Sequence, residues 1–155
     1  MKIKLATLND IESISLLNHE FWCYNADLQH EYYKKAKESG DYPKNVIINE
    51  DSDIFLAVEN DKIVGLIHVR ESQILPYASI VQHKYAEVID LIVTETYKRK
   101  CIGSLLINAA KKWSKLRNLD YLELFYQMPK VKLFFMNIML SIQFRILCDT
   151  KYKYT

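Results

Sequence analysis

Residues 84–126 contain a strand-like run, a helix-like run and a second strand-like run, and this order constrains the fold strongly. The three runs cover residues 84–93 (KYAEVIDLIV), 104–116 (SLLINAAKKWSKL) and 119–126 (LDYLELFY). A strand, a crossover helix and another strand predict a parallel pair, because only a long connection brings the chain back to the same end of a sheet. The region is therefore expected to form a layered structure with the helix packed on the sheet.

The residues before this unit predict further strands and two helices. Residues 53–58 and 62–70 are β-rich runs separated by Glu59, Asn60 and Asp61, which is typical of an antiparallel hairpin. A short strand over 2–6 leads into a helix that begins near Thr7 to Asp10, and a second helix is expected over 25–39. The predicted fold class is a mixed α/β sheet, mostly antiparallel, with helices on its faces.

Length and composition favour one domain over residues 1–155. The chain has 155 residues, half of them hydrophobic, and it shows neither an internal repeat nor a linker. Its formal net charge of +2 gives no global basic field for nucleic acid or for an anionic membrane. Because no apolar run is long enough to cross a bilayer and polar residues interrupt the N-terminus early, we expect a cytoplasmic protein with no membrane partner.

The cysteines and histidines show no metal-ligand spacing. Cys23, Cys101 and Cys148 are odd in number and scattered, so the sequence predicts free thiols and no metal. The four histidines are expected to be surface or locally hydrogen-bonded residues rather than catalytic ones: His19, His30, His68 and His83.

The segment from Val93 to Leu106 (VTETYKRKCIGSLL) predicts an anion site. In it, an apolar strand ends, a basic turn follows, and a helix begins near Gly103. The first N–H groups of a helix have no intrahelical partner, and the helix dipole favours negative charge at that end. The pattern therefore points to a phosphate-bearing ligand.

Together with the element order from Lys2 to about Tyr126, this segment resembles the GNAT superfamily of acyl-CoA-dependent N-acetyltransferases. The matching residues are Leu91, Val93, Tyr97, Lys98, Ile102, Gly103 and Leu106. The resemblance implies that acetyl-CoA is the co-substrate and that an amine attacks its thioester directly. It also implies a set of residues that bind acetyl-CoA: Leu91, Ile92, Val93, Lys98, Arg99, Lys100, Cys101, Ile102, Gly103 and Ser104.

The loop departs from the family pattern at two positions. Cys101 stands where the family has its first loop glycine, and Lys98 stands where it has arginine or glutamine. A side chain in the place of glycine leaves less room for the backbone to approach a pyrophosphate. A thiol at a helix N-terminus can be reactive, but we expect a passive cysteine here.

Two carboxylates are candidates for the base that deprotonates the amine. Glu87 is the first choice, because Tyr85 to Val88 resembles the Phe-Ala-Glu-Ile segment of the histone-acetyltransferase branch, where the glutamate is the base. Asp90 is the alternative. Strict alternation places the two on opposite faces of the strand unless a bulge intervenes, and either one could instead pair with a nearby Lys or Arg.

The family's general-acid tyrosine has no counterpart in the residues from 127 onward, which we describe as an atypical segment of the same domain. Tyr126 is a weak substitute. Reading Phe134 to Met139 one nucleotide earlier can give Phe-Tyr-Glu-Tyr-Tyr, which suggests a frameshift, and the coding DNA would test this. The segment is rich in apolar residues, so a homodimer is plausible.

Two other functions stay open. The first is a module of the same fold that binds acyl-CoA without turnover. The second is a nucleic-acid-binding protein that uses Lys98, Arg99, Lys100 and the basic residues in 151–154. Acetyl transfer to an amine, with no nucleic-acid partner, is the leading hypothesis, and the sequence does not identify the amine.

Overall fold

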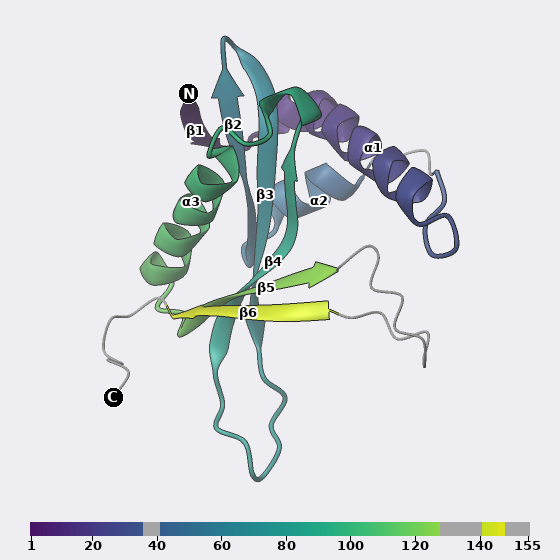
Figure 1. Ribbon diagram of the computed structural model, residues 1–155. Helices are drawn as coiled ribbons and strands as arrows, with labels where there is room; N and C mark the ends of the chain where they lie inside the picture. The colour runs from purple at the N-terminus through teal and green to yellow at the C-terminus, as the bar shows by residue number, and fades with distance from the viewer. Residues whose placement is uncertain (36–40, 128–140, 148–155) are drawn as a thin grey trace.

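The computed structural model describes residues 1–35, 41–127 and 141–147, and these form a single six-stranded sheet with helices on both faces (Figure 1). The strands are β1 (Lys2–Leu5), β2 (Ser52–Glu59), β3 (Lys62–Gln73), β4 (Lys84–Val93), β5 (Tyr121–Gln127) and β6 (Ser141–Leu147). They lie in chain order across the sheet, and only β4 and β5 are parallel. The predicted mixed sheet with one parallel crossover is confirmed.

Three α-helices cover the sheet. Helix α3 (Ile102–Leu116) makes the crossover from β4 to β5 and lies on one face, while α1 (Ile11–Leu28) and α2 (Tyr42–Ile48) lie on the other (Figure 1). Each face has its own core. The α3 core includes Ile67, Leu106 and Trp113, and the core under α1 and α2 includes Ile14 and Leu66.

The hairpin between β2 and β3 closes as its sequence predicts. Asn60 and Asp61 form its tip with φ of 50° and 58°. Two consecutive residues with positive φ are the requirement of a type I′ turn, and Asn and Asp tolerate that conformation better than most residues.

The prediction of a second helix over residues 25–39 is wrong. The first helix continues to Leu28 because Ala26 extends its buried stripe, and α2 is a short helix that begins at Tyr42. Pro43 lies in the first turn of α2. Proline fits there because the N–H groups of a first turn need no intrahelical partner.

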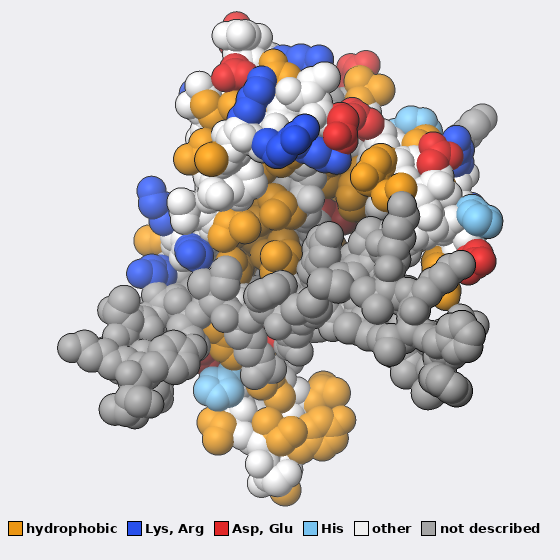
Figure 2. Space-filling view, in the orientation of Figure 1, with side chains coloured by type: hydrophobic (Ala, Val, Ile, Leu, Met, Phe, Trp, Pro, Cys, Tyr) orange, Lys and Arg blue, Asp and Glu red, His pale blue; other side chains and the backbone are white. Residues whose placement is uncertain are grey.

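The connection between β3 and β4 projects beyond the sheet and carries exposed apolar side chains. It forms the lower lobe of the molecule in Figure 2, and four of its large apolar residues are exposed: Leu75, Tyr77, Ile80 and Val81. Within the described residues, no helix has the length and apolar character that crossing a membrane requires.

Candidate active site

The parallel strands β4 and β5 separate along their length. They pair at only three positions, which are Ala86 with Leu122, Glu87 with Glu123 and Val88 with Leu124. Beyond Val88, β4 continues to Val93 beside β3. Strand β5 stays paired with β6 and diverges from β4 (Figure 1). In the described structure, residues 89–93 therefore have a sheet partner on one side only, and the other edge can bind an extended ligand.

The N-terminus of α3 lies beyond the C-terminal end of β4. Its first i to i−4 hydrogen bond runs from the Leu105 N–H to the Cys101 carbonyl, at 3.2 Å. The N–H groups of Ile102, Gly103 and Ser104 therefore precede the helical ladder. A Cβ built on Gly103 would have no atom within 4 Å, so the surface over this turn is open. The open turn leaves these N–H groups accessible to an anionic group.

The loop before α3 contains two strained residues. Arg99 and Cys101 have φ of 63° and 60°, and Cys101 is the N-cap of α3 in the left-handed conformation. Glycine adopts this conformation without the steric cost that a Cβ brings. The backbone therefore explains why glycine suits position 101 better than cysteine does.

Replacing Cys101 by glycine is expected to raise the free energy of unfolding by roughly 1 kcal/mol, because it removes the cost of the left-handed conformation. Urea denaturation of the Cys101→Gly variant measures the effect. Cys101→Ala is the matched control, since it removes the thiol and keeps the Cβ. Equal stability of the two variants would contradict the strain at this position.

The basic residues of the loop differ in how they are engaged. The Lys98 ammonium pairs with Glu95, which raises the pKa of Lys98, and it also lies 4.7 Å from the centre of the Tyr24 ring. The Lys100 ammonium lies 4.6 Å from the centre of the Tyr97 ring. Lys98, Arg99 and Lys100 are all exposed, so they add positive charge around the open helix N-terminus.

A bulge in β4 brings the two candidate carboxylates to one face. Asp90 pairs with His68 and Val88 pairs with Val69, so Ile89 is an extra residue in the register. Because one inserted residue reverses the alternation, Glu87 and Asp90 both face α1 and α2. The bulge that the sequence analysis named as the exception to strict alternation is therefore present, and the two carboxylates do not lie on opposite faces.

Glu87 is held by two neighbours. Its Oε2 accepts hydrogen bonds from Arg70 Nη2 at 2.7 Å and from Ser72 Oγ at 2.9 Å. The pairing partner that the sequence left open is therefore Arg70, whose side chain is half exposed. Glu87 lies on the same face as Asp90, but its Oε2 atom already accepts both of these hydrogen bonds.

Asp90 lies in a more buried environment. Burial raises the pKa of its carboxyl above the ordinary value, and a hydrogen bond from the Tyr42 hydroxyl to Oδ2, at 2.9 Å, opposes that rise. The same hydroxyl lies 2.6 Å from Nδ1 of His68. Tyr42, the first residue of α2, thus connects β3 and β4 at the bulge.

His68 is the most buried titratable group of this cluster, at 5% exposure. Burial lowers its pKa to about 4, with a smaller contribution from Arg70 and an opposing one from Glu87. It is therefore neutral at pH 7. Its Nε2 atom has no hydrogen-bond partner in the described part of the chain.

Acidification from pH 6.5 to 4 is expected to cost roughly 3 kcal/mol of stability through His68 alone. In this window the unfolded chain binds a proton at His68 and the folded chain does not, so stability falls as the pH falls. The free energy of unfolding, measured by urea denaturation across this range, should decline less in His68→Asn. Parallel curves for the two proteins would contradict the burial of a neutral imidazole.

The remaining predicted residues are placed as follows. The last three residues of β4, beside its free edge, are Leu91, Ile92 and Val93. Tyr126 lies in β5, two residues past the end of the β4–β5 pairing. Phe134 to Met139, which carry the frameshift hypothesis, lie outside the described residues, as does most of the apolar segment that suggested a dimer.

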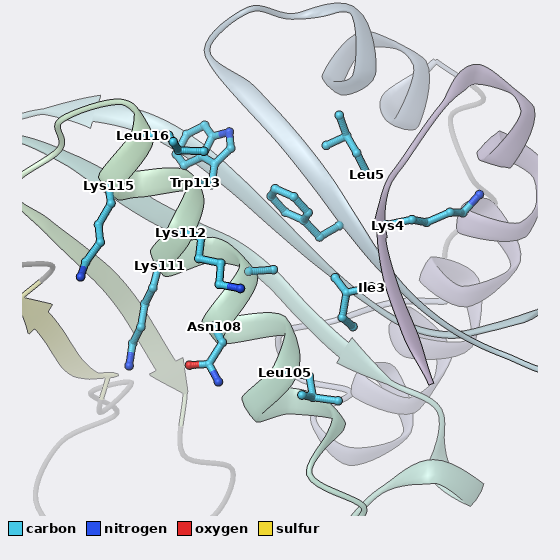
Figure 3. Close-up of a pocket in the computed structure, with 12 residues that line it drawn as sticks. Ile3, Lys4, Leu5, Leu105, Asn108, Lys111, Lys112, Trp113, Lys115 and Leu116 are labelled. Carbon is cyan, nitrogen blue, oxygen red and sulfur yellow. The ribbon is translucent and has the colours of Figure 1, made fainter.

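A groove lies on the face of the sheet that α3 covers, and none of the proposed catalytic residues line it. This groove of about 750 Å³ runs between β1 and α3 (Figure 3). Leu5 and Leu105 contribute apolar surface, and Lys111, Lys112 and Lys115 lie along α3. Across residues 1–35, 41–127 and 141–147, no group of three or more His, Cys, Asp or Glu side chains is arranged to hold a metal ion.

Sequence reasoning missed Tyr42 and His68 as parts of the site. His68 lies within the continuous apolar run of β3, and its place inside that run was the signal that it is buried. Nothing local marks Tyr42, because its partners lie 26 and 48 residues away in the chain.

Comparison with known proteins agrees with this architecture. The model of the acetyltransferase (GNAT) family matches residues 14–134. A mutant of the BH1408 protein from Bacillus halodurans aligns with a TM-score of 0.75 and 22% identity, covering 86% of this chain and 84% of that one. An acetyltransferase from Vibrio fischeri aligns with a TM-score of 0.65 and 14% identity, covering 80% and 94%.

A third solved structure is an aminoglycoside acetyltransferase from an uncultured soil metagenomic sample. It aligns with a TM-score of 0.63 and 18% identity, covering 84% of this chain and 82% of that one. A search of curated protein sequences gives no match. At these identities, the solved structures establish the shared fold.

Proposed function

Because the chain belongs to the GNAT family of acetyltransferases, we propose that it transfers an acetyl group from acetyl-CoA to an amine. One observation carries the proposal. The free edge of β4 leads toward the open N-terminus of α3, and the partly buried carboxylate of Asp90 lies at the bulge in the same strand. A ligand with an amide-containing arm and a phosphate group matches the edge and the helix terminus.

The binding of acetyl-CoA is assigned to the two predicted stretches. The backbone of Leu91 to Val93 lies where the amide groups of the arm can pair as an added strand. The N–H groups of residues 102–104 face the pyrophosphate, and the cations at 98–100 supply charge around it. The side chain of Cys101 borders this site.

We assign the base to Asp90, with Glu87 as the second candidate. An ammonium group must lose a proton before its nitrogen can attack, and a carboxyl whose pKa is raised by burial holds that proton better. The amine nitrogen then forms a bond to the thioester carbonyl carbon, the C–S bond breaks, and the thiolate takes up a proton. We propose Tyr126 as the donor of that proton, because it lies in β5 two residues past the last position that pairs with β4.

The acceptor is proposed to be an amine on the α1 and α2 side of the sheet, where Glu87 and Asp90 lie. Arg70 compensates the charge of Glu87, so the carboxylate of Asp90 is the group on this face that favours a cationic substrate. The likeness to an aminoglycoside acetyltransferase supports an amine-bearing acceptor.

Two measurements test the function. Calorimetry with acetyl-CoA should give saturable binding, and a panel of amines should release thiol in the presence of acetyl-CoA. Absence of binding would overturn the proposal. Binding without thiol release across the panel would favour the second candidate, an acyl-CoA-binding module of the same fold.

A further inference from the structure

Tyr42, His68 and Asp90 form one hydrogen-bonded chain that joins three elements. The Tyr42 hydroxyl lies 2.9 Å from Asp90 Oδ2 and 2.6 Å from His68 Nδ1. A hydroxyl has a single hydrogen, which Tyr42 donates to Asp90. His68 must therefore carry its proton on Nδ1 and donate it to the Tyr42 oxygen.

The direction of this chain follows from the charges of its members. His68 is neutral at pH 7 because its pKa is lowered, and burial with the nearby Asp90 raises the pKa of Tyr42, so both keep the one proton that the chain requires. His68 donates to Tyr42 and thereby strengthens the donation from Tyr42 to Asp90. The ring of Tyr42 also contacts the His68 ring edge to face, with centroids 5.7 Å apart.

We propose that Tyr42 and His68 are positioning residues that hold the Asp90 carboxylate in its charged form and in a single orientation for proton transfer. The inference rests on the proposed function, in which Asp90 is the base. Tyr42 occupies Oδ2, so the other oxygen of Asp90 is the one that takes the proton from the substrate amine. The unfilled acceptor at His68 Nε2 follows from the tautomer that this arrangement requires.

The other charged groups on this face do not account for the pKa of Asp90. Arg70 on β3 and Glu87 on β4 form an ion pair with each other. Helix α1 packs on the same face through Ile14 and Leu17, and none of its charged side chains contributes to the shifted pKa of Asp90. Tyr42 is therefore the hydrogen-bond donor that opposes the effect of burial on Asp90.

The test is the titration of Asp90 by carboxyl-carbon NMR in the wild-type protein and in Tyr42→Phe. Loss of the hydroxyl should move the midpoint of Asp90 to higher pH, because burial then acts without opposition. Tyr32→Phe is the matched control, since the Tyr32 side chain is exposed. An unchanged Asp90 midpoint in Tyr42→Phe would overturn the proposal.

The pH dependence of kcat/KM separates positioning from a merely structural role. Tyr42→Phe should lower kcat/KM about tenfold near neutral pH, and activity should recover as the pH rises past the new Asp90 midpoint. An equal loss at every pH would contradict the proposal. His68→Asn keeps an N–H that can reach Tyr42 and should retain more activity than His68→Leu, and equal losses in these two variants would also count against it.

The proposed function can fail separately. If the wild-type protein releases no thiol with any amine, acetyl transfer is refuted, while the NMR titration still decides whether Tyr42 holds Asp90 in its charged form. If the Asp90 midpoint moves in Tyr42→Phe but the acidic limb of the kcat/KM profile does not, the role in proton transfer is refuted.

Discussion

Asp90→Asn lowers kcat/KM for acetyl transfer by about 10²- to 10⁴-fold, which is the contribution expected of a positioned general base. The amide cannot take a proton from the substrate ammonium, yet it has nearly the same shape and can still accept the hydrogen bond from Tyr42. The affinity for acetyl-CoA, measured by calorimetry, should stay unchanged, because the side chain faces the side of α1 and α2.

Glu87→Gln is the matched comparison for this loss. Glu87 lies on the same face but is bound by Arg70 and Ser72, so its replacement should reduce kcat/KM by less than about tenfold. If Glu87→Gln proves to be the more damaging substitution, the base is Glu87, as the sequence first suggested.

The stability of Asp90→Asn separates a chemical defect from a folding defect. The pKa of Asp90 is raised in the folded protein, so ionisation of this carboxyl destabilises the fold once the pH exceeds its unfolded value. The asparagine variant should therefore unfold at a higher temperature than the wild type at pH 7. A lower melting temperature would mean that loss of activity reports on folding.

Gly103→Leu weakens the binding of acetyl-CoA at least about a hundredfold. A pyrophosphate held by the N–H groups of the first turn of α3 makes charge-assisted hydrogen bonds, and the loss of two of them accounts for that factor. The leucine side chain projects into the open space over this turn, where a Cβ meets no protein atom within 4 Å. Calorimetry with acetyl-CoA measures the effect.

Gly103→Ala is the control for the backbone. A methyl group fits the open space, and alanine favours the helix, so the unfolding free energy should rise by about 0.5 kcal/mol. The leucine variant should likewise be no less stable than the wild type. If both variants bind acetyl-CoA as the wild type does, the pyrophosphate does not lie over Gly103.

Much of the fold could be predicted because it depends on local patterns. The apolar runs over 84–93 and 104–116, the Asn60 and Asp61 turn, and the spacing of the crossover all act over a few residues. The prediction of a helix over 25–39 was wrong because it also used local patterns alone. The end of α1 depends on packing of Ala26, which a local pattern does not specify.

The sequence by itself determined the family, the mixed sheet and the place of the strand-to-helix junction after β4, since periodicity and such a junction are properties of neighbouring residues. Only the tertiary structure decided where the two candidate carboxylates lie and what holds them. The bulge at Ile89 moves Glu87 and Asp90 to one face, and Tyr42 reaches Asp90 across 48 residues of chain. Proton affinity depends on desolvation and on hydrogen bonds from distant residues, and these exist only after the chain has folded.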